Sequence, residues 1–212
     1  MMTPEERMHL VAQLLEEEYG AEEQGETGSS DPFRTLIGCV LSHRTRDANT
    51  ARATEALFKV VATPEEILSL EPDELSTLIR CSGFYNQKAR NITAICQDLV
   101  DNHGSTVPHD RETLMSLRGV GPKTADIVLS HAYNVPAIAV DVHVARVARR
   151  LGLADPKAGP EKVKTALEHL VSPKRYRFID NGFVRHGKKY CRKTNPRCLE
   201  CPLRGVCENP QN

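Results

Sequence analysis

Four of the seven cysteines lie near the end of the chain with the spacing C-x6-C-x2-C-x5-C. The segment around them is polar and irregular, whereas thiols that only fill space usually lie in apolar helices or strands. Four thiolates in one short segment therefore indicate a common partner, either a tetrahedral zinc ion or an iron–sulfur cluster, and the spacing does not choose between the two. The candidate metal ligands are Cys191, Cys198, Cys201 and Cys207.

A glycine-rich turn between two apolar runs forms the second candidate site. Residues 117–125 read LRGVGPKTA, which is typical of a helix, a tight hairpin and a second helix that begins at Pro122. We expect positive φ angles at Gly119 and Gly121, so that exposed backbone N–H groups can bind an anion such as a DNA phosphate. Taken alone, the pattern predicts phosphate contact and says nothing of catalysis. The candidate DNA contacts are Gly119, Val120, Gly121, Lys123 and Thr124.

An aspartate follows the hairpin at a distance of eighteen residues. Residues 140–143 read VDVH, and Asp141 stands immediately before another apolar helical run. By residue type and position Asp141 is a good helix N-cap. Taken alone, Asp141 therefore indicates only a helix start, and a catalytic role is suggested only together with the glycine hairpin and the four cysteines.

In this order, the Gly-Val-Gly-x-Lys hairpin, the Val-Asp-x-His element and the four-cysteine tail resemble the endonuclease III family of DNA glycosylases. The resemblance covers nearly the whole chain and includes Leu41-Ser42 with Asp47, and the loop of residues 83–86, GFYN, followed by Lys88-Ala89. It implies an all-α helix-hairpin-helix glycosylase fold, in which a six-helix domain and a cluster domain flank a DNA-binding cleft. It also implies a [4Fe–4S] cluster on the four cysteines in place of zinc.

The resemblance further implies a bifunctional DNA glycosylase and abasic-site lyase, which removes oxidised pyrimidines from double-stranded DNA in base excision repair. Carried over by position, Lys123 is the nucleophile that attacks C1′ and forms a Schiff base, and β-elimination then cuts the strand 3′ of the site. Asp141 is the carboxylate that assists base departure and deprotonation, and His143 is a DNA contact. The adenine-removing relatives carry a glutamate in an early helix, and residues 38–47 contain none.

Two other functions remain open from the residues themselves. One is a monofunctional mismatch glycosylase for thymine or uracil, in which Asp141 activates water. The other is an iron–sulfur DNA-binding protein without catalytic activity.

Two positions depart from the family's usual residues. Arg44 stands where the bacterial enzymes have glutamine, and Phe84 where leucine is usual. Extrusion of a base leaves a gap in the duplex, and an arginine with an aromatic ring can fill it by hydrogen bonding and stacking. We therefore expect Arg44 and Phe84 to contact DNA, and Arg44 to favour lesions opposite guanine.

The candidate residues must be positioned by helices, and sequence patterns typical of helices occur along the whole chain. Residues 3–6 (TPEE) and 63–66 (TPEE) each place threonine at the N-cap, proline at N1 and glutamate at N3. Apolar stripes of helical spacing follow at residues 92–99 and 163–170, and only residues 137–144 look like a strand. We predict about ten short helices, with one domain over residues 27–135 and a second formed by residues 1–26 and 136–212.

The composition is that of a folded globular chain. Its 212 residues include 28 basic and 28 acidic residues, which excludes a disordered chain and a global attraction to nucleic acid. The longest apolar stretch, residues 36–41, is too short to span a bilayer, so we expect no membrane contact and a cytoplasmic monomer, associated with the nucleoid in a prokaryote. Charge is nevertheless segregated, since the first 31 residues carry nine acids and residues 174–204 carry ten bases. The basic end is expected to face DNA phosphates, and the acidic end to face away.

Overall fold

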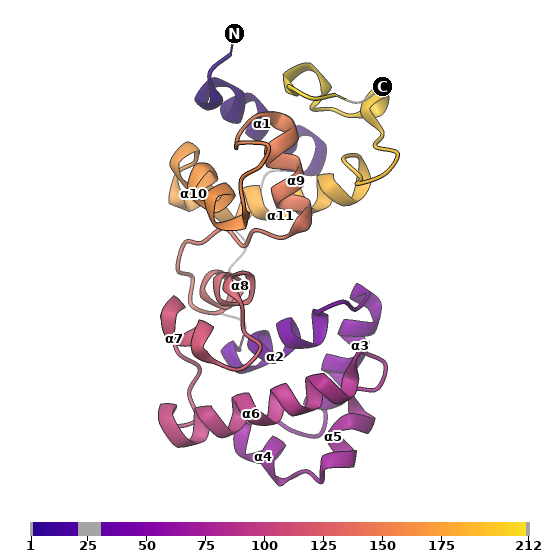
Figure 1. Ribbon diagram of the computed structural model, residues 1–212, viewed down its shortest axis with the longest axis vertical. Helices are drawn as coiled ribbons and strands as arrows, with labels where there is room; N and C mark the ends of the chain where they lie inside the picture. The colour runs from indigo at the N-terminus through magenta and orange to yellow at the C-terminus, as the bar shows by residue number, and fades with distance from the viewer. Residues whose placement is uncertain (1, 21–30, 211–212) are drawn as a thin grey trace. The chain divides into compact units, whose positions relative to one another are not determined.

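The computed structural model describes residues 2–20 and 31–210, and this part of the chain contains helices and no strand (Figure 1). The predicted all-α class is therefore confirmed. The chain splits into two compact units. We call Thr27–Val135 the central unit, and Met1–Glu26 with Pro136–Asn212 the terminal unit.

The central unit is a bundle of seven helices around one apolar core. Helix α2 packs against α3, α6 and α8, while α6 also packs against α4 and α5. The predicted stripe of residues 92–99 supplies fully buried side chains to this core, among them Ile92, Ile95 and Leu99. The helices are α2 (Pro32–Ser42), α3 (Asp47–Phe58), α4 (Pro64–Ser69), α5 (Pro72–Leu78), α6 (Tyr85–His103), α7 (Arg111–Ser116) and α8 (Pro122–Ala132).

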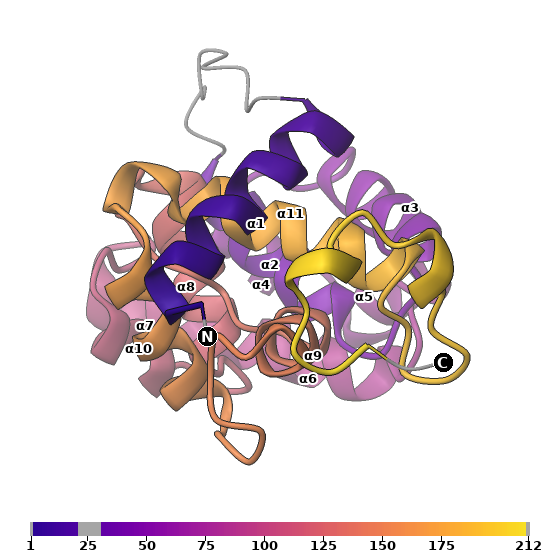
Figure 2. The same ribbon diagram turned by 90° about the horizontal axis from the view of Figure 1, so that it is seen from above.

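The terminal unit combines the first helix of the chain with its last third. Helix α9 packs against α10 and α11, and α1 packs against α10, α11 and η3 (Figure 2). A second core, which includes Met8, Val144, Leu167 and Phe183, fills the space between them. The elements are α1 (Pro4–Tyr19), α9 (Val142–Leu151), α10 (Pro160–Leu170), α11 (Tyr176–Lys189) and the 3-10 turns η1 (Pro173–Arg175), η2 (Cys198–Glu200) and η3 (Arg204–Val206).

The two capping boxes form as the sequence predicts. Thr3 accepts a hydrogen bond from the Glu6 N–H, and the Glu6 carboxylate accepts one from the Thr3 N–H at 2.8 Å. Thr63 and Glu66 exchange the same pair of bonds at the start of α4. Each box satisfies N–H groups that a helix start leaves without an intrahelical partner.

The strand predicted at residues 137–144 is wrong. This segment is extended only as far as Asp141, and α9 begins at Val142. Its apolar residues are buried, and carboxylates of neighbouring helices take the place of a partner strand: Glu168 accepts the Ile138 N–H at 3.2 Å and Asp180 the Ala139 N–H at 3.2 Å. A buried extended segment needs the same apolar residues as a strand, so the pattern could not separate the two.

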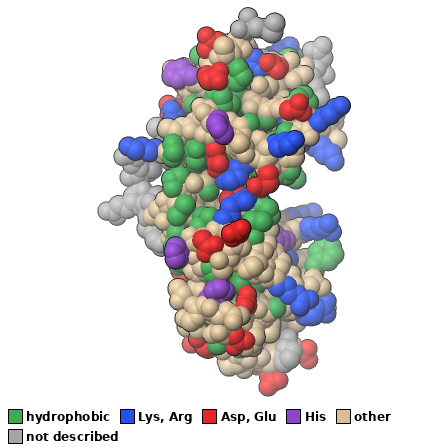
Figure 3. Space-filling model, turned by 60° about the vertical axis from the view of Figure 1, so that its left-hand side comes forward, with side chains coloured by type: hydrophobic (Ala, Val, Ile, Leu, Met, Phe, Trp, Pro, Cys, Tyr) green, Lys and Arg blue, Asp and Glu red, His purple; other side chains and the backbone are tan. Residues whose placement is uncertain are grey.

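The segregated charges of the two chain ends partly neutralise each other in the terminal unit. Glu16 of α1 pairs with Arg175, and Glu18 pairs with Lys189 at 2.7 Å. Acidic and basic side chains are interspersed over the face in Figure 3. Part of the basic end is thus paired with carboxylates of the acidic end, and which of the two faces DNA stays a prediction. None of the described helices is both long and apolar enough to cross a membrane.

Candidate functional site

The predicted hairpin joins α7 to α8, and only one of its two glycines has a positive φ. Gly119 has φ 79°, and a Cβ there would lie 2.7 Å from the side-chain amide nitrogen of Asn91, so any other residue would be strained and would have to displace Asn91. Gly121 has φ −107°, which corrects the expectation of a positive angle. The reason is Pro122, because a residue before proline is held in the extended region. Gly121 is the N-cap of α8.

Two of the predicted DNA contacts turn out to be buried side chains. Val120 belongs to the central core, and its N–H donates to the Leu117 carbonyl at 3.0 Å. The Thr124 side chain is also buried, with its hydroxyl 3.2 Å from His43 Nε2. Because both side chains are buried, DNA contact by these two residues stays a prediction for their backbone groups only. The hairpin offers instead the exposed Lys123 and the N–H groups of the first turn of α8.

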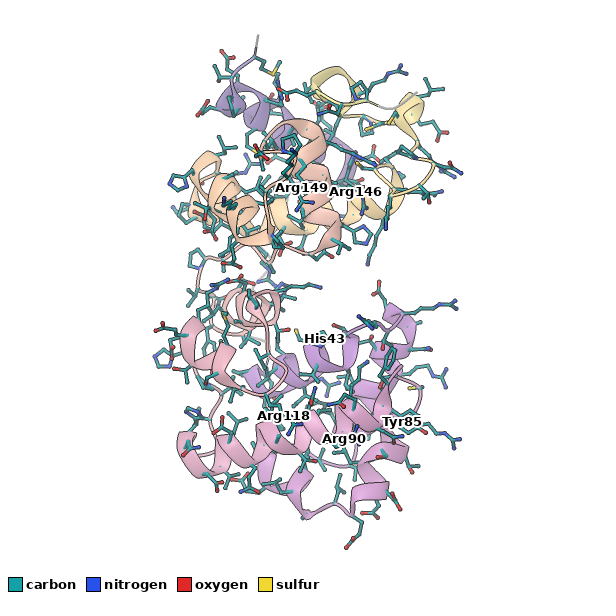
Figure 4. All side chains as sticks on the ribbon, viewed as in Figure 1. His43, Tyr85, Arg90, Arg118, Arg146 and Arg149 are labelled. Atoms are coloured by element: carbon teal, nitrogen blue, oxygen red, sulfur yellow. The ribbon has the colours of Figure 1, made fainter. Side chains whose placement is uncertain are left out.

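Lys123 lines a pocket of about 560 Å³ in the central unit. This volume falls within the range of small-molecule sites. The ends of α2, α6 and α8 supply the walls, and His43 lies at the end of α2 (Figure 4). Burial and the nearby Lys88 and Lys123 ammonium groups lower the pKa of His43, which keeps its ring neutral near pH 7. The lining residues are Val40, Ser42, His43, Arg44, Phe84, Gln87, Lys88, Asn91 and Lys123.

Arg44 and Phe84, predicted from their departure from the family pattern, both line this pocket on adjacent turns. Both residues have a left-handed backbone, with φ 51° at Arg44 and φ 59° at Phe84. The Arg44 guanidinium lies 5.8 Å from the centre of the Phe84 ring, within the range of a cation–π contact. The Phe84 side chain is 64% exposed, which is unusual for a large apolar residue.

Several pocket residues were not predicted as site residues, and Lys88 is the most deeply buried charged one. Its side chain is 4% exposed, and its Nζ donates to the Leu41 carbonyl and to the Thr45 hydroxyl, each at 2.6 Å. Burial lowers its pKa to about 8. A lysine in the first turns of an amphipathic helix is usually solvated, and nothing in the residue pattern marks this one as buried.

Asp141 caps α9 in the terminal unit. Its Oδ1 accepts the N–H groups of His143 at 2.7 Å and of Val144 at 2.9 Å, as predicted for an N-cap. Both bonds end on the same oxygen, and within the described chain Oδ2 accepts no hydrogen bond. The neighbouring Val142 side chain is 73% exposed. One carboxylate oxygen is therefore fixed by the backbone while the other can meet a substrate or water.

His143, the predicted DNA contact, is tied to the cysteine segment by an arginine of the same helix. Arg146 of α9 (Figure 4) has one guanidinium nitrogen 2.9 Å from His143 Nδ1. The same guanidinium donates to the Gly187 carbonyl at 3.0 Å and to the Cys191 carbonyl at 2.7 Å. The first turn of α9 and the start of the cysteine segment are thus held by one side chain.

The four predicted ligand cysteines gather in the terminal unit. Cys191 follows α11, Cys198 begins η2, and Cys201 and Cys207 follow η2 and η3. Burial, together with the three other thiols, raises the pKa of Cys201 to about 11, so these sulfurs are near enough to disfavour its thiolate. His186 Nε2 lies 3.4 Å from Cys201 Sγ, and Arg150 donates to Cys191 Sγ at 3.5 Å.

This donor set fits an iron–sulfur cluster. Four soft thiolates that burial and mutual repulsion disfavour need a cationic partner, and N–H donors to ligand sulfurs are a usual surrounding of such clusters. No group of three or more histidine, cysteine, aspartate or glutamate side chains in the described residues is arranged to hold a single metal ion.

The predicted site residues thus fall into two groups. Arg44, Phe84 and Lys123 line one pocket of the central unit. Asp141 and His143 lie at the start of α9 in the terminal unit, joined through Arg146 to Cys191.

Comparison with known proteins identifies relatives over most of the chain. Residues 37–173 match the family described as HhH-GPD superfamily base excision DNA repair protein. Endonuclease III of Thermotoga maritima is 44% identical over 179 residues, which cover 84% of this chain and 84% of that protein. Endonuclease III of Escherichia coli is 37% identical over 183 residues, 86% of each chain.

Solved structures give the same result. A trapped covalent intermediate between endonuclease III and DNA, with an estranged adenine, superposes with a TM-score of 0.89 at 34% identity, over 99% of this chain and 98% of that one. A non-covalent endonuclease III–DNA complex also has a TM-score of 0.89. A thermostable thymine-DNA glycosylase, 23% identical with a TM-score of 0.83, shares the fold.

Proposed function

We propose a residue-level reaction for this protein from one premise, that the chain belongs to the endonuclease III family of helix-hairpin-helix base excision repair proteins. It is accordingly a DNA N-glycosylase and abasic-site lyase that acts on damaged DNA. The residue roles, the lesion class, the cofactor and the location that follow belong to the proposal. We take the central and terminal units as its two domains, residues 27–135 and residues 1–26 with 136–212.

Lys123 is the nucleophile of this proposal. Its uncharged amine attacks C1′ of the damaged nucleotide, the bond from C1′ to the base breaks, and the base leaves with the bonding electrons and takes up a proton. The lysine nitrogen then loses a proton, O4′ of the sugar takes one up, and the C1′–O4′ bond breaks, which opens the ring and leaves a protonated Schiff base between Lys123 and C1′. This Schiff base acidifies the C2′ proton. Loss of that proton breaks the C3′–O bond, which cuts the strand 3′ of the site, and hydrolysis of the imine frees the lysine. The exposed position of Lys123 at the start of α8, in a pocket wall, supports this role.

Asp141 is the carboxylate partner. Its Oδ1 is held by two backbone N–H groups, and the start of α9 stabilises its negative charge. Its Oδ2 is then free to accept a proton from the attacking amine or to stabilise the positive charge on the sugar. We infer the substrate class, oxidised pyrimidines, from family membership.

Arg44 and Phe84 fill the gap that the extruded nucleotide leaves. The exposed ring of Phe84 can stack on a neighbouring base pair, and Arg44 can donate two parallel hydrogen bonds to an orphan guanine. Gly119, Gly121 and the N–H groups of the first turn of α8 bind a backbone phosphate, and His143 contacts DNA from α9.

Cys191, Cys198, Cys201 and Cys207 hold a [4Fe–4S] cluster. The supporting observation is the gathering of four partly buried thiols, since Cys191 and Cys198 are near enough to raise the pKa of both Cys201 and Cys207. When bound, the cluster supplies a fixed charge centre that cross-links a segment with little regular structure. We infer that the protein acts on double-stranded DNA as a monomer in the cytoplasm, associated with the nucleoid, and its bacterial relatives support this location.

The observation that carries the reaction is the exposed amine of Lys123 on the pocket wall, beside the glycine hairpin. We expect Lys123→Gln to abolish strand cleavage and borohydride trapping on abasic DNA, with binding of that DNA retained within about tenfold, because the hairpin backbone is intact. Asp141→Asn should slow base excision more than lyase activity on a preformed abasic site. Wild-type trapping yield in Lys123→Gln would show that another amine is the nucleophile.

A further inference from the structure

Lys88 holds together two turns that are separate in the sequence. Its ammonium donates to the Leu41 carbonyl at the end of α2 and to the Thr45 hydroxyl in the turn between α2 and α3, each at 2.6 Å. The Thr45 oxygen also accepts the Gly83 N–H, at 3.1 Å, in the turn before α6. One hydroxyl therefore connects both turns, and Lys88 fixes that hydroxyl.

The two turns also touch without any side chain between them. A Cβ at Gly83 would lie 3.2 Å from the Arg44 carbonyl oxygen, so the two backbones are in close approach. Arg44 lies on one turn and Phe84 on the other, and both hold a left-handed backbone that arginine and phenylalanine seldom adopt. Such a conformation persists only where its surroundings impose it.

Lys88 is too enclosed to serve as an ordinary phosphate ligand. Its side chain is 4% exposed, and two of its three N–H donors are already used inside the protein. Charge buried to this extent is costly unless it is hydrogen-bonded, and this cost is visible in its pKa, which burial lowers to about 8. Arg90, two residues along the same helix and on another face of it, is exposed and is an example of a solvated cation on α6.

We propose that Lys88 is a positioning residue that, through Thr45, holds the Arg44 and Phe84 turns together as a single wedge for the DNA duplex. It does so without contacting DNA. The inference rests on the proposed function in one respect, that Arg44 and Phe84 enter the base stack. A ready-made wedge spares the protein the ordering of two turns at the moment when the nucleotide is extruded.

The test compares two substrates that carry the same abasic site. A duplex requires the wedge because the extruded sugar leaves a gap opposite an unpaired base, whereas a single-stranded oligonucleotide has no such gap. We expect Lys88→Met to lower the single-turnover rate of borohydride trapping on the duplex by about 10-fold to 100-fold, as misplaced groups do. On the single strand its rate should stay within about twofold of the wild type.

Two further variants separate position from charge. Arg90→Met removes one exposed cation from the same helix and should leave the duplex rate within about twofold. Thr45→Val keeps the Lys88 charge but removes the shared hydroxyl, and it should show the same duplex-specific loss. Because both changes break one connection, the double variant Lys88→Met/Thr45→Val should be no slower than Lys88→Met alone.

A fluorescent 2-aminopurine placed opposite the abasic site reports whether the wedge enters the stack. Wild-type protein should raise its emission by unstacking it, and Lys88→Met and Thr45→Val should not. If Lys88→Met does not fold, as judged by its circular dichroism and Tm, Thr45→Val decides the matter with the same two readouts.

The contrary outcomes are distinct. Equal losses on single strand and duplex would make Lys88 part of the chemistry and overturn the proposal, and so would a duplex-specific loss in Arg90→Met as large as that in Lys88→Met. Absence of trapping by the wild type on either substrate would instead refute the proposed Schiff-base function.

Discussion

In the central unit the candidate residues lie on turns between packed helices, whereas in the terminal unit the four cysteines lie on a segment whose regular structure is two 3-10 turns. The helices that flank these turns, α2, α6 and α8, share one apolar core, and this packing holds the turns in position. The cysteine segment is held by side chains that bind its backbone, with Arg146 on the Cys191 carbonyl and Arg150 on the Arg192 carbonyl, each at 2.7 Å.

This difference indicates how each region keeps its geometry. Apolar packing involves many small contacts, so the loss of one polar bond leaves the helices of the central unit in place. The cysteine segment has few buried apolar residues, and its fully buried side chain is Leu203, which lies between η2 and η3. Its order should therefore depend on the cluster, and the following predictions test this contrast from the largest expected effect to the smallest.

The largest effect is expected from the cysteines. The purified protein should be yellow-brown with about four irons per chain, and Cys201→Ala should lose them. Because metal binding is folding free energy for such a segment, the variant should be cleaved by protease beyond α11 while the central unit stays resistant. Elemental analysis that gives one zinc and no iron would contradict the proposal, as would a Cys201→Ala protein with native protease resistance.

The next effect concerns the central core. Ile92 is fully buried in α6, and Ile92→Ala should lower the free energy of unfolding by about 2–5 kcal/mol, through lost burial and the cavity left behind. Iron content should not change. The neighbouring Thr93 is exposed, and Thr93→Ala should stay within about 0.5 kcal/mol of the wild type in the same urea titration. A loss of iron in Ile92→Ala would show that the two regions are not independent.

Smaller effects are expected at the wedge. Arg44→Ala should bring the single-turnover rates on lesions opposite guanine and lesions opposite adenine closer together. The difference in activation free energy between the two duplexes should shrink by up to about 1–3 kcal/mol. Phe84→Ala should slow both duplexes alike, because stacking of about 1–3 kcal/mol is indifferent to the base. Unchanged discrimination in Arg44→Ala would leave that arginine as a phosphate contact.

The smallest effect concerns pH. The pKa of Lys88 is about 8 in the folded protein and returns to its ordinary value near 10.5 on unfolding. Between these two pKa values the unfolded chain binds more protons than the folded protein, so Lys88 makes the free energy of unfolding rise with pH. Below about pH 8 the buried ammonium is charged in the folded protein and its destabilising effect is complete. The wild type should therefore gain stability relative to Lys88→Met between pH 7 and pH 9.5, measured by urea unfolding. Parallel curves for the two proteins would contradict the buried charge.

The helices and their starts could be predicted because the signals are local. Thr3, Thr63 and Asp141 cap helices by bonds to residues two or three positions away, and Gly119 takes the positive φ expected of a tight turn. The buried position of Lys88 could not be predicted from the sequence, because its partners Leu41 and Thr45 lie more than 40 positions away. Family resemblance, and not spacing, separated an iron–sulfur cluster from zinc.

The left-handed backbone conformations of Arg44 and Phe84 could not be predicted from the sequence either. Neither residue type favours positive φ, so only the long-range contacts of the two turns could specify it. The same holds for the extended segment at residues 137–141, whose partners are carboxylates of α10 and α11 and not a strand.

The assembly of the terminal unit from both ends of the chain has a consequence for biosynthesis. Arg7 of α1 donates to the Leu151 carbonyl across 144 positions, and α1 also packs on η3 near the C-terminus. The contiguous central unit is synthesised before α10, α11 and η3, against which α1 packs. The central unit can therefore fold first, while the apolar face of α1 stays uncovered until those elements are made. Helix α1 is therefore synthesised before its partners and is among the last elements to dock, and nascent chains that stall before α11 expose Met8, Val11 and Leu15 to chaperones and proteases.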